Sequence, residues 1–162
     1  MVNNMSKQIK TNVMRILDRA KISYEALEYP HGNEALEGNE VASLMGQNPD
    51  AVFKTLIARG KSGEYYVFDI PVSSTLNLKK AAKAVGEKSI EMTHVKDLKK
   101  ICGYERGNVS PLGMKGDFVT VFNESALGFE WIYISGGKIG TQVKVNPVNL
   151  INLINAKTSD IV

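Results

Sequence analysis

The segment KTLIARGKSGEYYVFDIPV, from Lys54 to Val72, contains two apolar runs joined by the short link GKSG. β-Branched and aromatic residues fill both runs, and a glycine stands at each end of the link, a pattern typical of an antiparallel hairpin. The pattern predicts two strands on either side of residues 60–63. It also places a charged side chain, that of Lys54, at the head of a strand that otherwise has the composition of a buried element.

Helix signals occur in separate blocks along the chain, where apolar residues recur at helical spacing after a residue that caps helices well. Glycines at 46, 86 and 103 mark three of the helix ends. Helices are predicted at 11–22 (capped by Thr11 or Asn12), 39–46 (capped by Asn39), 77–86 (capped by Asn77), 93–103 (capped by Thr93) and 148–156, with one further helical turn at 48–53.

Short alternating or continuous apolar runs lie between the helical blocks. Because turns of a few residues join most of these runs, the sequence predicts an α+β fold with a largely antiparallel or mixed sheet that curls toward a barrel. The 162 residues are expected to form one domain spanning 1–162. Strands are predicted at 23–29, 54–59, 64–72, 88–92, 117–123, 130–135 and 141–146.

The charge balance and the cysteine count exclude several classes of protein. The 20 Lys and Arg are offset by 17 Asp and Glu, and a net charge of +3 is too small for a dedicated duplex-DNA binder. The single Cys102 allows neither an internal disulfide nor a cysteine-based zinc site, which fits a reducing cytoplasm. No apolar run reaches the roughly 20 residues that span a bilayer, and the first residues are too polar for a signal peptide. We therefore expect a cytoplasmic protein that binds no metal and has neither a membrane nor DNA as a partner.

Few residues offer the usual catalytic chemistry. The sequence has no P-loop, no G-x-S-x-G and no H-E-x-x-H motif. Of the two histidines, His94 is expected on the surface and His31 in a loop, and Cys102 is expected to be a small core residue.

Lys54 and two glycine-rich segments are the stronger candidates for a site. Lys54 is either a lysine that reaches from a strand into water or a fixed cation at the rim of a pocket. The segments 103–116 and 135–140 are rich in glycine, so they form either tight turns or backbone surfaces that approach a ligand closely. Together, these three features favour a pocket that binds an anion or a carbonyl oxygen.

Four motifs, in this order and spacing, resemble the YbaK/EbsC family of aminoacyl-tRNA deacylases: VFKTL, LNLKKAAKAVGEKSIEM, GYERGNVSPLGMK and IYISGGKIG. The resemblance covers nearly the whole chain. It implies a curved mixed sheet or distorted barrel flanked by helices, related to the editing domain of bacterial prolyl-tRNA synthetase. It also implies removal of cysteine from tRNA for proline without a cofactor, through attack of the substrate thiol on its own ester to give a thiolactone.

The resemblance assigns roles to particular residues. Lys54, Gly107 and Tyr29 match catalytic positions. Substrate-binding positions are matched by Thr55, Ser110, Pro111, Ser135, Gly136 and Gly137. Two positions depart from the family pattern: Glu37 replaces an aromatic residue, and Gln142 replaces an acidic residue, so a carboxylate role at 142 cannot be carried over.

The resemblance also implies partners, namely the 3′ acceptor end of an aminoacyl-tRNA and, as a further candidate, prolyl-tRNA synthetase. The lysines at 79, 80, 83 and 88 form either a tRNA-binding surface or an ordinary solvated helix face. Two other functions remain open at this point: deacylation of another aminoacyl-tRNA such as alanyl- or prolyl-tRNA, and binding of a nucleotide or an aminoacyl end without cleavage.

Overall fold

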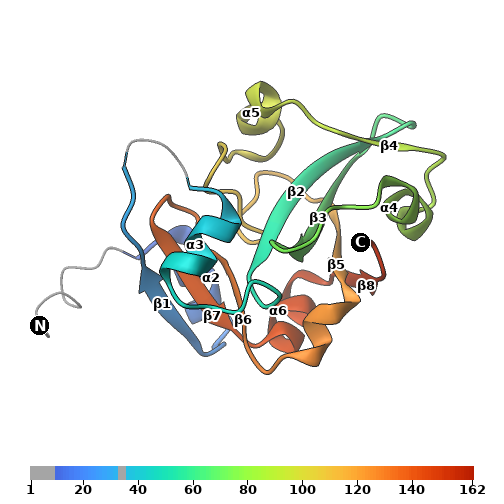
Figure 1. The fold of residues 1–162 in the computed structure, drawn as a ribbon. Helices are drawn as coiled ribbons and strands as arrows, with labels where there is room; N and C mark the ends of the chain where they lie inside the picture. Colours follow the sequence, from blue (N-terminus) through green and yellow to red (C-terminus); the bar gives the residue numbers. More distant parts are fainter. Residues whose placement is uncertain (1–9, 33–35) are drawn as a thin grey trace, which may run out of the picture.

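The computed structural model describes residues 10–32 and 36–162, and their strands form two separate sheets (Figure 1). The predicted loop at 30–38 lies partly outside these ranges. The small sheet has the order β1 (Tyr24–Glu28), β7 (Thr141–Val145), β6 (Ile132–Ser135) and is antiparallel throughout. The large sheet has the order β4 (Ile90–Met92), β2 (Phe53–Gly60), β3 (Tyr65–Pro71), β5 (Val119–Asn123), β8 (Lys157–Ser159).

The predicted α+β class with a mixed, largely antiparallel arrangement of strands is confirmed. Only the pairs β3–β5 and β5–β8 are parallel. The strands do not close into a barrel. Instead, an isolated parallel bridge between Val52 and Tyr133 connects the sheets, and Tyr133 N–H donates to the carbonyl of Ala51 (2.9 Å).

The described part of the chain contains five α-helices. Their bounds are α2 (Asn12–Arg19), α3 (Gly38–Leu44), α4 (Leu78–Val85), α5 (Leu98–Cys102) and α6 (Pro147–Ile154), with 3₁₀ turns η1 (Val95–Asp97) and η2 (Glu124–Gly128).

The ends of α2 and α4 follow the predicted capping signals. The side chain of Thr11 accepts from Met14 N–H, and that of Asn77 accepts from Lys80 N–H. Helix α4 ends at Gly86, whose positive φ of 74° is the left-handed conformation that glycine adopts without strain.

Helix α3 begins earlier than predicted. Glu37, not Asn39, is its N-cap, because the side chain of Glu40 reaches back to accept from Glu37 N–H (3.0 Å). The helix still ends next to Gly46, as expected.

Two other predicted helical segments also differ. Residues 48–51 form a hydrogen-bonded turn rather than a turn of helix, and Val52 and Phe53 already belong to the bridge and to β2. The segment 93–103 divides into η1 and α5 because Thr93 extends the pairing of β4 with β2: its hydroxyl donates to the carbonyl of Ile57 (2.9 Å) and does not cap a helix. The sequence prediction also missed β8 and η2.

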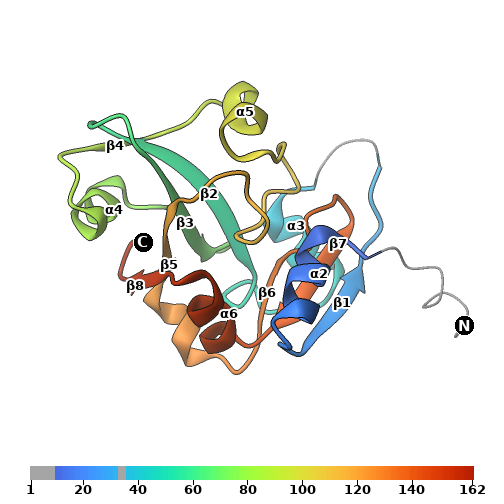
Figure 2. The ribbon, with the colours of Figure 1, turned by 180° about the vertical axis from the view of Figure 1, so that it is seen from behind.

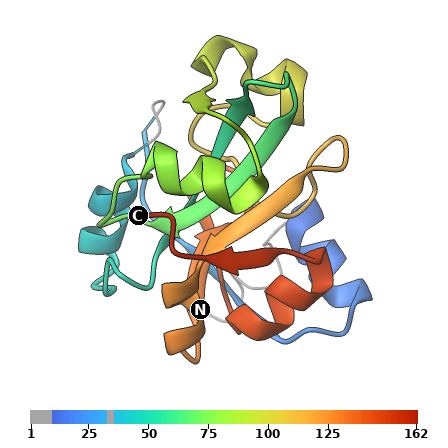
Figure 3. The ribbon, with the colours of Figure 1, turned by 90° about the vertical axis from the view of Figure 1, so that its right-hand side faces the viewer.

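The large sheet is covered on both faces. Helix α4 lies across one face, where Ala81 packs against Phe68 and Ile70 (Figure 3). On the other side of the molecule, α2 and α6 lie side by side (Figure 2) and pack against β6 and β7 around Phe53 and Phe122, whose ring centroids are 6.1 Å apart. Within residues 10–32 and 36–162, no helix has the length and apolar character needed to cross a bilayer.

Candidate active site

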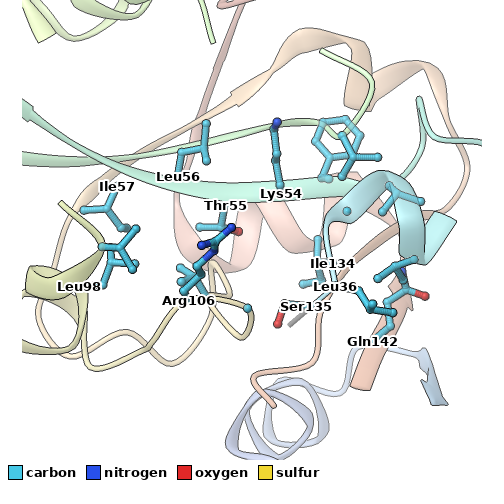
Figure 4. Close-up of a pocket in the computed structure, with 18 of the residues that line it drawn as sticks. Leu36, Lys54, Thr55, Leu56, Ile57, Leu98, Arg106, Ile134, Ser135 and Gln142 are labelled. Carbon is cyan, nitrogen blue, oxygen red and sulfur yellow. The ribbon is translucent and has the colours of Figure 1, made fainter. Parts of the chain in front are cut away.

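A cavity of about 300 Å³ lies along β2, between the two sheets (Figure 4). Its walls come from segments far apart in the chain: β2, the start of α3, the segment from β4 to α5, the 103–116 loop, and the adjoining ends of β6 and β7. The described residues that line it include no histidine, cysteine, aspartate or glutamate. It is therefore a mostly apolar cavity with a few polar groups, of the kind that binds small molecules.

The edge of β2 that faces the cavity is partly unpaired. Val52 accepts from Val72 N–H (2.8 Å) and Gly60 N–H donates to Glu64 (2.8 Å), so the even-numbered residues of this strand bond to β3. In an antiparallel ladder the N–H and C=O groups of the odd-numbered residues then point to the opposite edge of the strand, away from β3. At that second edge the carbonyl of Ile57 accepts from Thr93 N–H (3.3 Å), and β4 continues from there.

Between the Val52 bridge and Ile57, the N–H and C=O of Thr55 therefore face the cavity. No backbone hydrogen bond joins them to any residue that the structure describes. We call residues 53–57 the open edge of β2. It presents a main-chain donor and acceptor to a ligand, much as a sheet edge receives an extended peptide.

Lys54 and Thr55 flank this open edge. In Figure 4 the Lys54 side chain leaves β2 on the same side as Leu56, and Thr55 leaves it on the opposite side, next to Arg106. Lys54 is half-buried, and its ammonium has no hydrogen bond or ion pair with any described residue. A positive charge is thus available at the cavity without an internal counter-ion.

The structure brings five of the predicted site residues to one cavity. Tyr29, Lys54, Thr55, Gly107 and Ser135 all line it, although they come from four separate segments. Gly107 has a φ of 97°, a conformation in which any other residue would be strained. The backbone conformation therefore requires glycine here, so the main chain at this wall carries no side chain.

The other four predicted residues lie behind the wall. The hydroxyl of the fully buried Ser110 donates to the carbonyl of Ser135 (2.9 Å), and the hydroxyl of Ser135 donates to the carbonyl of Asn108 (3.2 Å) and accepts from Gly137 N–H (3.1 Å). These bonds tie the two glycine-rich segments together. Of the same four, Pro111 and Gly136 are also buried and do not line the cavity. Direct contact of these four residues with a substrate stays a prediction.

The two departures from the family pattern both have structural partners. Gln142 is 3% exposed, lines the cavity, and exchanges two amide hydrogen bonds with Gln47 (2.7 and 3.1 Å). Glu37 pairs with Arg106 (3.0 Å), so an ion pair joins the start of α3 to the 103–116 loop beside the cavity. The sequence prediction missed Arg106 as a lining residue, although it precedes Gly107.

A buried carboxyl group lies next to the cavity wall. Asp69 is Thr55's partner in the pairing of β2 with β3, is 0% exposed, and accepts a 2.5 Å hydrogen bond from the Thr55 hydroxyl through Oδ1. Its Oδ2 has no hydrogen-bond partner in residues 10–32 and 36–162. Burial raises the pKa of Asp69 to about 8, against a smaller opposing effect of the Thr55 hydrogen bond. The sequence signal was present, since Asp69 is the one charged residue within YYVFDIPV.

The cysteine and the two histidines considered in the sequence do not line the cavity. Cys102 is fully buried, and burial raises the pKa of its thiol, so the prediction of a core cysteine is confirmed. His94 is exposed, as expected, and His31 is also exposed, with Nδ1 2.9 Å from the carbonyl of Gly32. In the described ranges, no group of three or more His, Cys, Asp or Glu side chains gathers where a metal could bind.

The fold and the cavity define a class of small α+β proteins in which a lysine and a glycine main chain line one cavity, and sequence comparison names this class. Residues 30–153 match the aminoacyl-tRNA editing domain, and the chain belongs to this family.

One relative is "Putative Cys-tRNA(Pro)/Cys-tRNA(Cys) deacylase EbsC" of Enterococcus faecalis, 38% identical over 154 residues, which are 95% of this chain and 94% of the relative. The resemblance inferred from the sequence motifs is thereby confirmed.

Solved structures agree with the fold. A structure titled "putative trans-editing enzyme for prolyl tRNA synthetase" superposes with a TM-score of 0.79 at 22% identity, covering 94% of this chain and 98% of that one. Another, "hypothetical protein APE2540", has a TM-score of 0.84 at 21% identity, covering 93% of this chain and 99% of its own.

Proposed function

We propose that this protein removes cysteine that has been attached by mistake to tRNA for proline, acting in trans on the 3′ acceptor end. Membership of the editing family and the name given to the Enterococcus faecalis relative support this proposal. The observation that carries it is the cavity itself. It combines the open edge of β2, the main chain of Gly107 and the ammonium of Lys54, which pairs with no described residue. The described lining offers no carboxylate or imidazole that could activate water.

A cavity whose described lining offers no general base suits a substrate that supplies its own nucleophile. In the proposed reaction the cysteine sulfur attacks its own ester carbonyl, so a C–S bond forms and the bond to the terminal ribose oxygen breaks. The thiol proton ends on that oxygen, and the products are a four-membered thiolactone and free tRNA. No water or cofactor is consumed.

The protein's own groups would then position the substrate and stabilise the negative charge that develops on its carbonyl oxygen. Main-chain N–H groups along the cavity, at Gly107 and at Thr55, are suited to hydrogen-bond the carbonyl oxygen as negative charge develops on it. Lys54 supplies a cation for the ribose or phosphate of the terminal adenosine. Apolar neighbours such as Val41, Leu98 and Ile134 limit the cavity to a small side chain and exclude water.

The test is deacylation of cysteinyl-tRNA for proline by the purified protein, followed as loss of the ester. We expect Lys54→Ala to lower kcat/KM by about 100-fold, the usual effect of removing one group that stabilises charge. Lys61→Ala is the matched control, because Lys61 is exposed at the far end of the same hairpin and does not line the cavity. Equal rates for Lys54→Ala and the wild type would contradict the assignment of the site.

The nature of the nucleophile is tested with substrates that differ only at sulfur. S-alkylated cysteinyl-tRNA and alanyl-tRNA should resist deacylation, because neither carries a free thiol. Turnover of either would favour attack by water and a broader deacylase. Tight binding of every aminoacyl-tRNA with no turnover would indicate a binding module instead.

Prolyl-tRNA synthetase is the partner we propose for tRNA selection. The net charge of +3 is modest for a protein that must select one tRNA by itself. Addition of the synthetase should therefore improve discrimination between tRNA for proline and tRNA for cysteine.

A further inference from the structure

Asp69 is a buried acidic group that the proposed reaction does not use. It lies on β3, directly opposite Thr55 of β2, and among the described residues the single hydrogen bond of its carboxyl group joins Oδ1 to the Thr55 hydroxyl (2.5 Å). Thr55 in turn lines the cavity at the open edge of β2. Within the described part of the chain, the one hydrogen bond of the Asp69 carboxyl group thus runs to a residue of the site.

We propose that Asp69 is a positioning residue that sets the direction of the Thr55 hydroxyl and thereby decides whether this hydroxyl donates a hydrogen bond into the cavity. The proposal rests on the proposed function, because it assigns Thr55 to the substrate-binding wall.

The reasoning follows from the hydrogen-bonding capacity of the two groups. A carboxylate only accepts, so an ionised Asp69 holds the single hydroxyl hydrogen of Thr55 and leaves only lone pairs toward the cavity. A neutral Asp69 can donate its own proton to Thr55 Oγ1, and the Thr55 hydrogen is then free to point at a ligand. Only the neutral form therefore gives the cavity an extra donor beside the substrate ester.

Burial favours the neutral form at physiological pH. Asp69 is 0% exposed, and no described residue bonds to its Oδ2. A missing hydrogen bond is far more costly for a carboxylate oxygen than for an oxygen of a neutral acid. With its pKa raised to about 8, the group is mostly protonated at pH 7 and mostly ionised at pH 9.

No charged neighbour in the described part of the chain opposes the neutral form of Asp69. Across β2 Asp69 faces Thr55, across β5 it faces Phe122, and β5 has no ionisable residue. Side chains alternate between the two faces of a strand, so Arg59 on β2 and Tyr65 on β3 share this face, whereas Lys54 leaves β2 on the opposite face. The titratable and charged side chains on the other elements around this face are Tyr133 on β6, Cys102 on α5, and Tyr104, Glu105, Arg106 and Lys115 on the loop. None of them forms an ion pair or a hydrogen bond with Asp69 in the part of the chain that the structure describes.

The first experiment compares pH–rate profiles. The kcat/KM for deacylation of cysteinyl-tRNA is measured from pH 6.5 to pH 9 for the wild type and for Asp69→Asn, whose amide can donate to Thr55 at every pH. The ratio of the two cancels the titration of the substrate thiol. We expect the ratio of wild type to variant to fall about tenfold between pH 7 and pH 9, as one ionisation near pH 8 requires. A ratio that stays constant with pH would overturn the proposal.

The second experiment needs no activity. The side-chain carboxyl carbon of Asp69 is followed by NMR as a function of pH in the wild type, in Thr55→Val and in Thr55→Ser. We expect a titration midpoint far above that of an ordinary aspartate, a further increase in Thr55→Val, and a return toward the wild type in Thr55→Ser, which keeps a hydroxyl. An ordinary midpoint, or one that Thr55→Val leaves unchanged, would refute the coupling.

The two experiments separate this proposal from the proposed function. A wild-type protein that deacylates nothing refutes the function, and the NMR titration still decides whether Asp69 and Thr55 act as a pair. An active protein with uncoupled titrations refutes only the role of Asp69.

Discussion

At the scale of the residue, two polar side chains in buried positions have very different hydrogen-bonding environments. Both polar atoms of the Gln142 amide have a partner in the reciprocal pair with Gln47, so this side chain can lie at the cavity wall at little cost. The carboxyl group of Asp69 is satisfied only in part, because Oδ2 has no partner among the residues that the structure describes. Partly satisfied buried groups lower stability, and they are found where function requires them.

Asp69 should make stability depend on pH. Its pKa is about 8 in the folded protein and near 4 in an unfolded chain, so the folded state binds more protons between these values. The contribution of Asp69 to stability is therefore greatest below about pH 4 and is lost as pH rises toward 8. Relative to Asp69→Asn, the unfolding free energy of the wild type should fall by roughly 1 kcal/mol per pH unit in this window. Urea unfolding of both proteins at pH 5, 7 and 9 measures the difference, and parallel curves would mean that Asp69 is not buried as a neutral acid.

At the scale of the element, local sequence signals predicted most helix ends, and long-range pairing decided the exceptions. Asn77 caps α4 as expected because the signal lies within four residues. Thr93 does not cap a helix, because its partner is Ile57 in another strand. Strand β8 was missed since it has only three residues, two of them exposed, and pairs in parallel with a distant strand.

The distinction between local sequence signals and long-range pairing also applies to the site. Lys54, Gly107 and Ser135 were predicted from motifs and do share a cavity. The open edge of β2, the Arg106–Glu37 pair and the Thr55–Asp69 pair were not predicted, because each depends on which strands and loops meet in space. The division of the strands into two sheets depends on the bridge at Val52, which has no local signature.

Two asparagines near helix starts provide a matched test of the caps. Asn77→Ala should lower the unfolding free energy by about 1 kcal/mol, because it removes the acceptor for Lys80 N–H. Asn39→Ala should have little effect, because Asn39 is exposed and the N-cap of α3 is Glu37. Thermal or urea unfolding of the two variants measures both effects. A larger loss in Asn39→Ala than in Asn77→Ala would contradict the observed helix start.

At the scale of the whole molecule, the C-terminal segment completes the core of the large sheet. Ile161 is fully buried with Phe68, Ile70 and Val121, and its N–H donates to Oδ1 of Asn123 (3.1 Å). The last residues of the chain thus bind back onto the centre of the fold, beside α4 (Figure 3).

Ile161→Ala should therefore lower the unfolding free energy by about 2–4 kcal/mol, the usual cost of emptying a buried isoleucine site. The control is Val148→Ala on α6, since Val148 is 48% exposed and contributes little. Urea unfolding gives both values. If the two substitutions cost the same, the C-terminal segment does not pack as described.

The open edge of β2 has a consequence for self-association. Unpaired main-chain groups on an exposed strand attract the strands of other molecules, and this leads to aggregation. A lysine on such a strand opposes intermolecular pairing, because its ammonium would have to lose water. Replacement of Lys54 by alanine should therefore remove the catalytic cation and also make the protein more prone to aggregate. The loss of activity in that variant reports on catalysis only in samples that light scattering shows to be monodisperse.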